Sequence, residues 1–291
     1  METERSMLPT RIIRDWLEAR LGVSLALAGE RTSPVVSRPA SAPGDDAGLT
    51  AVRLNGRSLI VARGEWVEPI VRVVAGLHPD LLFTPFGSFE LSRVTIPDGV
   101  SVWGPNWYLF GDPESWPAPA DNRVVALTAD ELSEVDFELF WHCVGPGSLA
   151  AFGVYSRFGT NKGETLAALA TVKDRGRPFM EIGVDVAPDA QASGLGSAVV
   201  SATGKWILEQ GRLPLATVAP FNVPSTRTLR RVGLEYGFTE MSGVPGPFRV
   251  PPQPIGRPLP DVDVYDYYPA WAMNRDIRPR PETQGSAPAG D

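Results

Sequence analysis

The chain has 291 residues, 43% of them hydrophobic, and a formal net charge of −7 at pH 7. It is long enough to bury one or two hydrophobic cores. The acidic balance, without a dense run of lysine or arginine, argues against nucleic acid as a partner. Cys143 is the single cysteine, and the two histidines, His78 and His142, lie far apart in the sequence, which excludes an internal disulfide and a typical structural zinc site.

Charged residues interrupt every apolar run near the N-terminus, so we expect no signal peptide. No stretch is long and apolar enough to span a bilayer. The sequence therefore predicts a cytoplasmic protein with neither a membrane partner nor a metal, and it leaves the oligomeric state open.

The sequence of residues 1–120 predicts a small α+β domain of unknown role. Apolar residues at helical spacing indicate an amphipathic helix over 9–21. The Pro, Ser, Gly and Asp content of 31–48 favours a flexible linker. An Asn-Gly pair at 55–56 supplies the positive φ angles of a tight turn. We therefore expect a β-hairpin over residues 52–62.

A helix is expected over 66–77, with its proline in the first turn. The aromatic residues of 81–110, set between Gly and Pro, favour short strands that pack in the core of this domain. Three prolines in 112–122 indicate a domain border, which separates residues 1–120 from a second domain at 121–243.

The sequence of the second domain indicates a regular order of strands and helices. Thr128 and Glu131 have the spacing of a capping box, so a helix begins near Ala129, with an apolar stripe that reaches Cys143 and an end at 145–147. The other expected elements are strands at 124–127, 151–157, 166–173, 178–187 and 215–219, and helices at 194–210 and 224–232. The order is β, α, β, β, β, α, β, α.

The remaining residues, 244–291, are interpreted as a proline-rich extension. Residues 244–260 contain too many prolines for a central strand or helix. The aromatic cluster at 264–271 is expected to pack back on the body, and the chain after 275 is expected to be disordered.

The clearest chemical signal is a strand, a glycine-bearing loop and a helix start between Glu181 and Ala198. Such an arrangement directs several backbone N–H groups and the positive end of a helix dipole at one point, which suits a phosphate. Gly194 and Gly196 matter because a side chain at either position would hold the phosphate away from those N–H groups. The segment therefore predicts a phosphate site.

Two other phosphate-binding motifs are excluded. The dinucleotide fingerprint needs a small last residue, where this chain has Val199, and an acidic residue ending the next strand, where it has 217–219, Thr-Val-Ala. The P-loop is excluded because Gly204-Lys205 is followed by Trp206 and lies inside the predicted helix.

What fits is the signature of the GNAT N-acetyltransferase superfamily, [RQ]-x-x-G-x-[GA] after a strand that ends in a V-x-P-like turn. The chain resembles it at 186–188, Val-Ala-Pro, followed by Gln191, Gly194 and Gly196. The superfamily also has an Asn near the end of the next strand, a small residue three positions later, and a Gly with a large apolar residue at the end of the short helix.

Asn222, Ser225 and Gly233-Leu234 stand at those later positions, although Phe is commoner where Leu234 lies. The resemblance covers about 123–243. It implies an α/β fold, a mixed twisted sheet with flanking helices, preceded here by the additional α+β domain. It also implies acetyl-CoA as the acetyl donor, no metal, and transfer to the amine of a small molecule or peptide.

Carried over residue by residue, the resemblance implies that the backbone of one strand holds the pantetheine arm, that loop amides hold the diphosphate, and that the next helix lines the opposite wall. The residues concerned are Val184, Val186, Gln191, Ala192, Ser193, Gly194, Leu195, Gly196, Ser197, Asn222 and Ser225. For Asn222 and Ser225, a helix cap explains the sequence equally well.

Amine acetylation needs a base, and a base in this superfamily often lies on the strand before the loop. Strand periodicity puts Glu181 and Asp185 on one face, so Glu181 is the first candidate and Asp185 the second. The alternative for either residue is a solvated or cross-strand-paired carboxylate without a catalytic role. The superfamily often has a Tyr that protonates the thiolate seven residues after the Asn, where this chain has Leu229. The acid could instead be Ser225, Tyr236 or water, or the thiolate could leave unassisted.

His142 and Cys143 are adjacent, and neighbouring residues of a helix point about 100° apart, so they are not expected to form a catalytic pair. Cys143 fits the apolar stripe, and His142 is expected to interact with the helix C-terminus. Two other hypotheses remain open. One is a non-catalytic acyl-CoA-binding or interaction module, and the other is that the glycines serve only helix packing.

Overall fold

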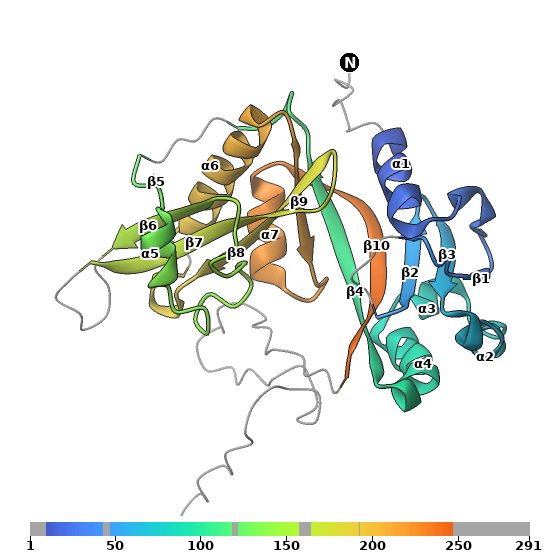
Figure 1. Ribbon diagram of the computed structural model, residues 1–291. Helices are drawn as coiled ribbons and strands as arrows, with labels where there is room; N and C mark the ends of the chain where they lie inside the picture. The colour runs from blue at the N-terminus through green and yellow to red at the C-terminus, as the bar shows by residue number, and fades with distance from the viewer. Residues whose placement is uncertain (1–9, 43–46, 118–121, 157–163, 192, 247–291) are drawn as a thin grey trace, which may run out of the picture.

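The computed structural model describes residues 10–42, 47–117, 122–156, 164–191 and 193–246. Within these residues ten strands form one mixed sheet, in the order β1-β3-β2-β10-β4-β9-β8-β7-β6-β5, with helices on both sides (Figure 1). The predicted fold class, a mixed sheet with flanking helices, is confirmed. The helices are α1 (Thr10–Leu21), α2 (Gly64–Val74), α3 (Pro79–Leu82), α4 (Pro85–Thr95), α5 (Ala129–Ser133), α6 (Leu195–Glu209) and α7 (Val223–Arg231).

The strands differ widely in length. They are β1 (Val35–Ser37), β2 (Leu49–Leu54), β3 (Arg57–Ala62), β4 (Val100–Gly111), β5 (Val125–Ala126), β6 (Ala151–Ser156), β7 (Thr165–Asp174), β8 (Phe179–Val186), β9 (Leu213–Val218) and β10 (Leu234–Pro245). The hairpin β2–β3 forms as predicted, with φ of 50° at Asn55 and 75° at Gly56. β1 lies inside the expected linker, where it pairs in parallel with β3 as the edge strand.

Helices cover both faces of the β1–β4 part of the sheet. On one face α1 packs Trp16 and Leu17 against alternate residues of the hairpin, such as Val52. On the other face α2 and α4 pack against the intervening residues, such as Ala51. The period of two along the strands therefore serves two separate cores.

β4 corrects the prediction of short strands over 81–110. The structure has two helices, α3 and α4, followed by one strand of 12 residues. Pro79 and Pro85 open the two helices, because proline lacks only an N–H that a first helical turn leaves unpaired. The predicted packing of the aromatic residues is confirmed for Phe83, Tyr108 and Phe110, which are buried, whereas Phe86 and Phe89 are exposed.

β4 also links the two halves of the chain. It pairs with β9 on one side and with β10 on the other, and β10 in turn pairs with β2. The strands before residues 112–122 and the strands after them therefore belong to one sheet. The border placed there remains a prediction about domains, but the strands on its two sides share one sheet.

The second half contains the predicted meander β6-β7-β8, which is antiparallel throughout. α6 packs on one face of these strands, and residues 132–144 cover the other. The predicted helix over 129–144 is wrong in its extent, because α5 ends at Ser133. The Asp136 carboxylate accepts the N–H of Glu138 at 2.9 Å and so forms a turn that competes with the helix.

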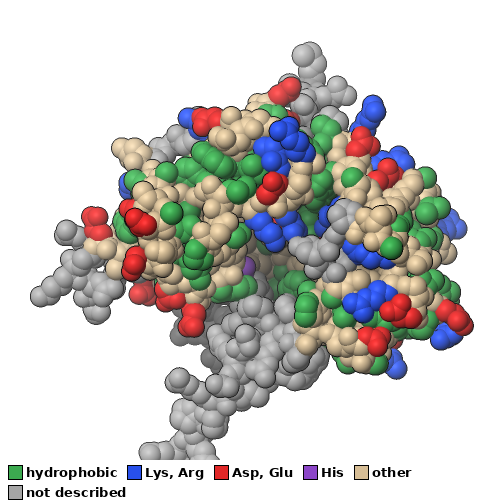
Figure 2. Space-filling model, in the orientation of Figure 1, with side chains coloured by type: hydrophobic (Ala, Val, Ile, Leu, Met, Phe, Trp, Pro, Cys, Tyr) green, Lys and Arg blue, Asp and Glu red, His purple; other side chains and the backbone are tan. Residues whose placement is uncertain are grey.

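β10 was not predicted, and it occupies 234–245, partly within the region expected to be unsuited to a strand. The predicted aromatic cluster at 264–271 and the predicted disorder after 275 lie outside the described residues, as does the 43–46 part of the linker. On the face drawn in Figure 2, basic side chains lie mainly at the centre and right, among acidic ones, and the left side is mostly acidic. In the part of the chain that the structure describes, no helix has the length and apolarity to cross a membrane. The same part contains no cluster of three or more His, Cys, Asp or Glu side chains suited to a metal ion.

Candidate active site

Two parallel strands separate at the centre of the sheet. β8 and β9 pair from Phe179 opposite Leu213 to Glu181 opposite Leu215, which is the last pair of their register. β8 nevertheless continues to Val186, and over this length its partner among the described strands is β7, on the other side. The edge of β8 that faces β9 therefore borders open space, and a strand edge of this kind can bind an extended ligand through its backbone.

A cavity of about 420 Å³ lies where this gap meets the start of α6, and we call it the α6 cavity. All but one of the residues predicted to hold the donor line it. They are Val184, Val186, Gln191, Ser193, Gly194, Leu195, Gly196, Ser197, Asn222 and Ser225. Ala192 lies outside the described residues. The fold thus brings the predicted set together, while its role in binding stays a prediction.

The start of α6 has the features of an anion site. Gly194 adopts a φ of +82°, a conformation that glycine reaches without strain. The first helical hydrogen bond of α6 runs from the N–H of Ala198 to the oxygen of Gly194 at 3.1 Å, so the N–H groups of the residues between them precede the helical ladder. The first turn contains no acidic residue, and Arg227 and Arg231 of α7 line the same cavity. This donor set fits a diphosphate.

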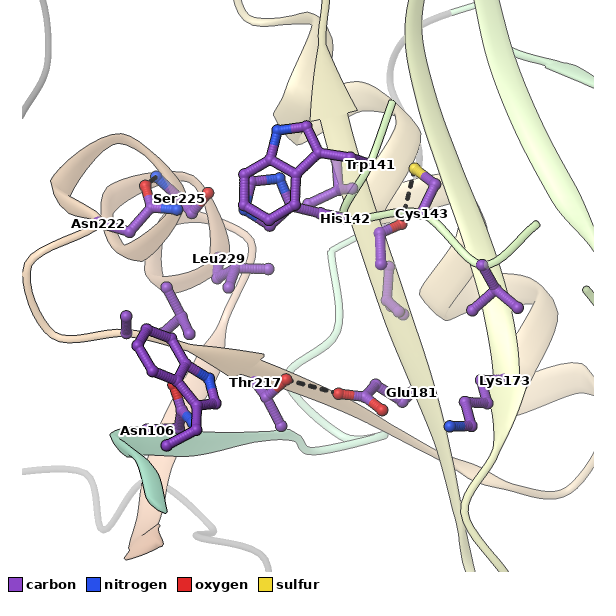
Figure 3. Close-up of a pocket in the computed structure, with 17 residues that line it drawn as sticks. Asn106, Trp141, His142, Cys143, Lys173, Glu181, Thr217, Asn222, Ser225 and Leu229 are labelled. Carbon is purple, nitrogen blue, oxygen red and sulfur yellow. Dashed lines mark hydrogen bonds between the residues drawn. The ribbon is translucent and has the colours of Figure 1, made fainter. Parts of the chain in front are cut away.

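A second cavity of about 420 Å³ adjoins the first, and we call it the central cavity. Trp103 and Asn106 of β4, residues 141–144, strands β7 to β9 and α7 form its wall (Figure 3). The two cavities have four lining residues in common, His142, Val184, Asn222 and Ser225. A ligand along β8 in the α6 cavity therefore reaches the central cavity at these residues.

Glu181, the first candidate base, lies in the wall of the central cavity, but its carboxylate is engaged. Thr217 Oγ1 donates to Oε1 at 2.6 Å, and Arg175 Nε lies 3.0 Å from Oε2. Arg175 also donates to the hydroxyl of Tyr108 on β4. The guanidinium offsets the charge of Glu181 and fixes its side chain.

Asp185, the second candidate, is held differently. Its carboxylate accepts the backbone N–H of His142 at 2.7 Å and lies 2.5 Å from His142 Nδ1. Sequence reasoning missed this pair and assigned His142 to a helix end that does not exist. The available signal was Gly183, since a glycine within a strand indicates a close approach of other backbone. A Cβ there would lie 2.4 Å from the oxygen of His142.

The side chains of His142 and Cys143 have different partners, Asp185 and the backbone of Leu169, although neither residue lies on the predicted helix. The Cys143 thiol is buried and points to the backbone oxygen of Leu169 at 3.5 Å. Burial, with a further contribution from the Asp185 carboxylate, raises the pKa of this thiol. Cys143 is therefore a neutral packing residue of the wall.

α7 supplies the opposite wall. The Asn222 side chain accepts the N–H of Ser225 at 3.2 Å, so Asn222 is the N-cap of α7 while it also borders both cavities. Leu229 is buried and lines the central cavity. It has no hydroxyl to offer, and Tyr236, which hydrogen-bonds Thr239, is not among the residues lining either cavity.

Residues 157–241 match the family model described as FR47-like protein. This part of the chain is therefore similar to a family model related to the GNAT superfamily, which confirms the predicted resemblance. This relationship supports acyl transfer as the general class of reaction. A search of curated proteins gives no match.

Solved structures give remote matches. A putative GNAT acetyltransferase from Novosphingobium aromaticivorans is 19% identical with a TM-score of 0.40, and the match covers 50% of this chain and 66% of that one. A GCN5-related N-acetyltransferase from Kribbella flavida is 19% identical with a TM-score of 0.39, and the match covers 54% and 64%. The chain thus spans just under two thirds of the length of these two structures. TM-scores this low add nothing to the argument about activity.

Proposed function

We propose that this protein is an acetyl-CoA-dependent N-acetyltransferase that transfers the acetyl group to the amine of a small molecule or peptide. The observation that carries the proposal is the junction of the α6 cavity and the central cavity at His142, Val184, Asn222 and Ser225. A donor whose diphosphate binds at α6 would present its thioester at this junction. The central cavity would then hold the acceptor amine.

The donor side is supported by the N–H groups before Ala198 and by the two arginines of α7. It is also supported by the edge of β8 beyond Glu181, which has no partner strand among the described residues. When bound, acetyl-CoA supplies an activated acetyl group, and the residues of this chain orient it and exclude water. The acceptor side is supported by Trp103 and Asn106, through which the first half of the chain shapes the central cavity. A reducing compartment such as the cytoplasm is part of the proposal, since the one cysteine is a buried thiol.

A non-catalytic acyl-CoA-binding module is the second candidate, and the observation that favours it is Leu229, which places no hydroxyl at the junction. The two candidates differ in turnover. Titration calorimetry with acetyl-CoA, followed by a thiol-release assay with a panel of amines, separates them. Binding with release on at least one amine supports the transferase, whereas binding without release on any amine supports the module.

Ser197→Glu tests the proposed diphosphate site without weakening the helix. Ser197 is the third residue of α6, where a carboxylate stabilises a helix through its dipole. The same charge would repel a diphosphate at the N–H groups beside it. We expect the Kd for acetyl-CoA to rise at least about tenfold, which corresponds to ~1.4 kcal/mol, with an unchanged or higher Tm.

Ser197→Gln is the matched control, because it has the same size without the charge, and its Kd should stay much closer to that of the unmodified protein. If Ser197→Glu binds acetyl-CoA as tightly as the parent, the site is not where we place it. The glycines of the loop would then serve helix packing alone.

A further inference from the structure

The segment that carries His142 is fixed directly onto the sheet. The N–H of Val144 donates to Thr171 Oγ1 of β7 at 2.7 Å, and Gly183 of β8 lets the backbone of His142 approach the strand closely. Two strands therefore determine the position of a residue that lies in no regular element.

Asp185 determines which imidazole nitrogen is available. A carboxylate only accepts hydrogen bonds, so the nitrogen 2.5 Å from Asp185, Nδ1, carries the proton, and Nε2 carries a lone pair. The second oxygen of Asp185 accepts the backbone N–H of the same histidine. This double contact fixes both the ring orientation and the tautomer.

His142 is also at the right place to serve both substrates. Among the described residues that line both cavities, it is the one with an ionisable side chain. Its side chain is 30% exposed, against 13% for Asp185. The ring of Trp141 lies against the imidazole with 3.3 Å between ring centroids, which further limits its rotation. Glu181, by contrast, has both oxygens engaged by Thr217 and Arg175.

We propose that His142 carries the proton from the acceptor amine to the departing thiolate, with Asp185 as its positioning residue. The inference rests on the proposed function. Nε2 takes a proton from the ammonium form of the acceptor, and the neutral amine attacks the thioester carbonyl, so that a C–N bond forms and the C–S bond breaks. The thiolate of coenzyme A leaves with the electron pair, and the acylated nitrogen still has one proton too many.

His142 takes up one proton and gives it back within the same turnover, and a second proton leaves to water. The excess proton of the acylated nitrogen is released to water, and the imidazolium returns its own proton to the sulfur, which restores Nε2. Leu229 cannot supply this proton, so the junction needs another donor. The charged groups that line the two cavities with His142 are Asp185, Glu181, Lys173, Arg227 and Arg231, and the pH dependence of the step reflects all of them.

Three variants test the proposal in the full chain. His142→Gln removes the base, and Asp185→Asn keeps the size of the carboxylate but can donate to Nδ1 and so favour the wrong tautomer. His78→Gln is the matched control, since His78 also contacts an aspartate, Asp80, but is 60% exposed and lines neither cavity.

We expect His142→Gln to lower kcat by about 10² to 10⁴, with the Kd for acetyl-CoA from calorimetry within about twofold of the parent. The limb of the pH–rate profile that depends on His142 should disappear. Asp185→Asn should lower kcat at least about tenfold, and His78→Gln should leave kcat and the profile unchanged. Equal kcat and an equal pH profile in His142→Gln would overturn the proposal, even if the protein acetylates amines.

The tautomer gives a readout that needs no turnover. The chain has two histidines, so His142→Gln assigns both sets of imidazole signals in a long-range proton–nitrogen NMR spectrum. We expect the neutral ring of His142 to be protonated on Nδ1 in the parent and on Nε2 in Asp185→Asn. A ring protonated on Nε2 in the parent would overturn the proposal. If the parent binds acetyl-CoA without turnover on any amine, the proposed function fails first and the inference fails with it.

Discussion

Among single residues, Cys143 illustrates how burial in the wall of the site affects stability. Burial raises the pKa of its thiol in the folded state, whereas in the unfolded chain the thiol ionises near pH ~8.5. The folded state therefore retains its proton longer. The resulting stabilisation is fully present below the unfolded pKa and is lost as the pH rises above it.

The prediction concerns the free energy of unfolding between pH ~7.5 and ~9.5, measured with urea. The parent should lose up to about 1.4 kcal/mol for each pH unit above the unfolded pKa of the thiol. Cys143→Ala should start lower, because it loses packing, but should decline less steeply. Parallel curves for the two proteins would contradict the assigned burial of the thiol.

The site residues that sequence reasoning found are those whose role is local. Gly194, Gly196 and Asn222 act through the backbone within a few residues, so their spacing alone indicates their positions. The pair of His142 and Asp185 is 43 residues apart and depends on the path of a segment without regular structure. Spacing carries no such information, and only the glycine at 183 marks the contact.

At the scale of elements, Gly204 shows why α6 contains a glycine in its interior. The ring of Trp116, from the segment after β4, lies directly on it, and a Cβ at Gly204 would lie 1.9 Å from Trp116 Cζ2. Trp116 Nε1 also donates to the oxygen of Ser201 at 3.0 Å. The glycine therefore allows the link between the two halves of the chain to pack on α6.

Gly204→Ala should lower the free energy of unfolding by about 1 to 3 kcal/mol, since the added methyl group forces the indole away from the helix. Denaturant unfolding measures this directly. Gly145→Ala is the control, because nothing lies within 4 Å of a Cβ built there. It should leave stability unchanged or raise it by up to about 1 kcal/mol. Equal stability of Gly204→Ala and the parent would contradict the close contact.

Helix and strand boundaries were predictable where they depend on residues close together in the sequence. The capping box of Thr128 and Glu131 forms as expected, with the N–H of Thr128 donating to Glu131 at 2.8 Å. The end of α5 was not predictable from its apolar stripe, because the Asp136 side chain competes for the backbone. In the same way, Pro85, which the sequence pattern indicates as punctuation between short strands, is the first residue of α4, whereas Pro105 lies within β4. Tertiary packing decides between these alternatives.

At the scale of the whole molecule, the main feature of the topology is the position of β4. It separates β9 from β10, so the second half of the chain, which includes the residues that match the FR47-like model, completes its sheet with a strand from the first half. Trp16 of α1 and Phe110 of β4 also pack against Phe179 of β8 and Phe238 of β10. No local pattern predicts an inserted strand of this kind, because its two partners come more than a hundred residues later in the chain.

The expected consequence is that the two halves unfold together. A fragment of residues 122–246 would lose β4 and α1, and loss of a buried aromatic side chain alone costs about 3 to 5 kcal/mol. Two such losses approach the ~5 to 15 kcal/mol that stabilises a whole domain. Calorimetry of the full chain should therefore give one transition, and the fragment should give none. Two transitions in the full chain, or cooperative unfolding of the fragment, would instead support independent domains divided near residue 121.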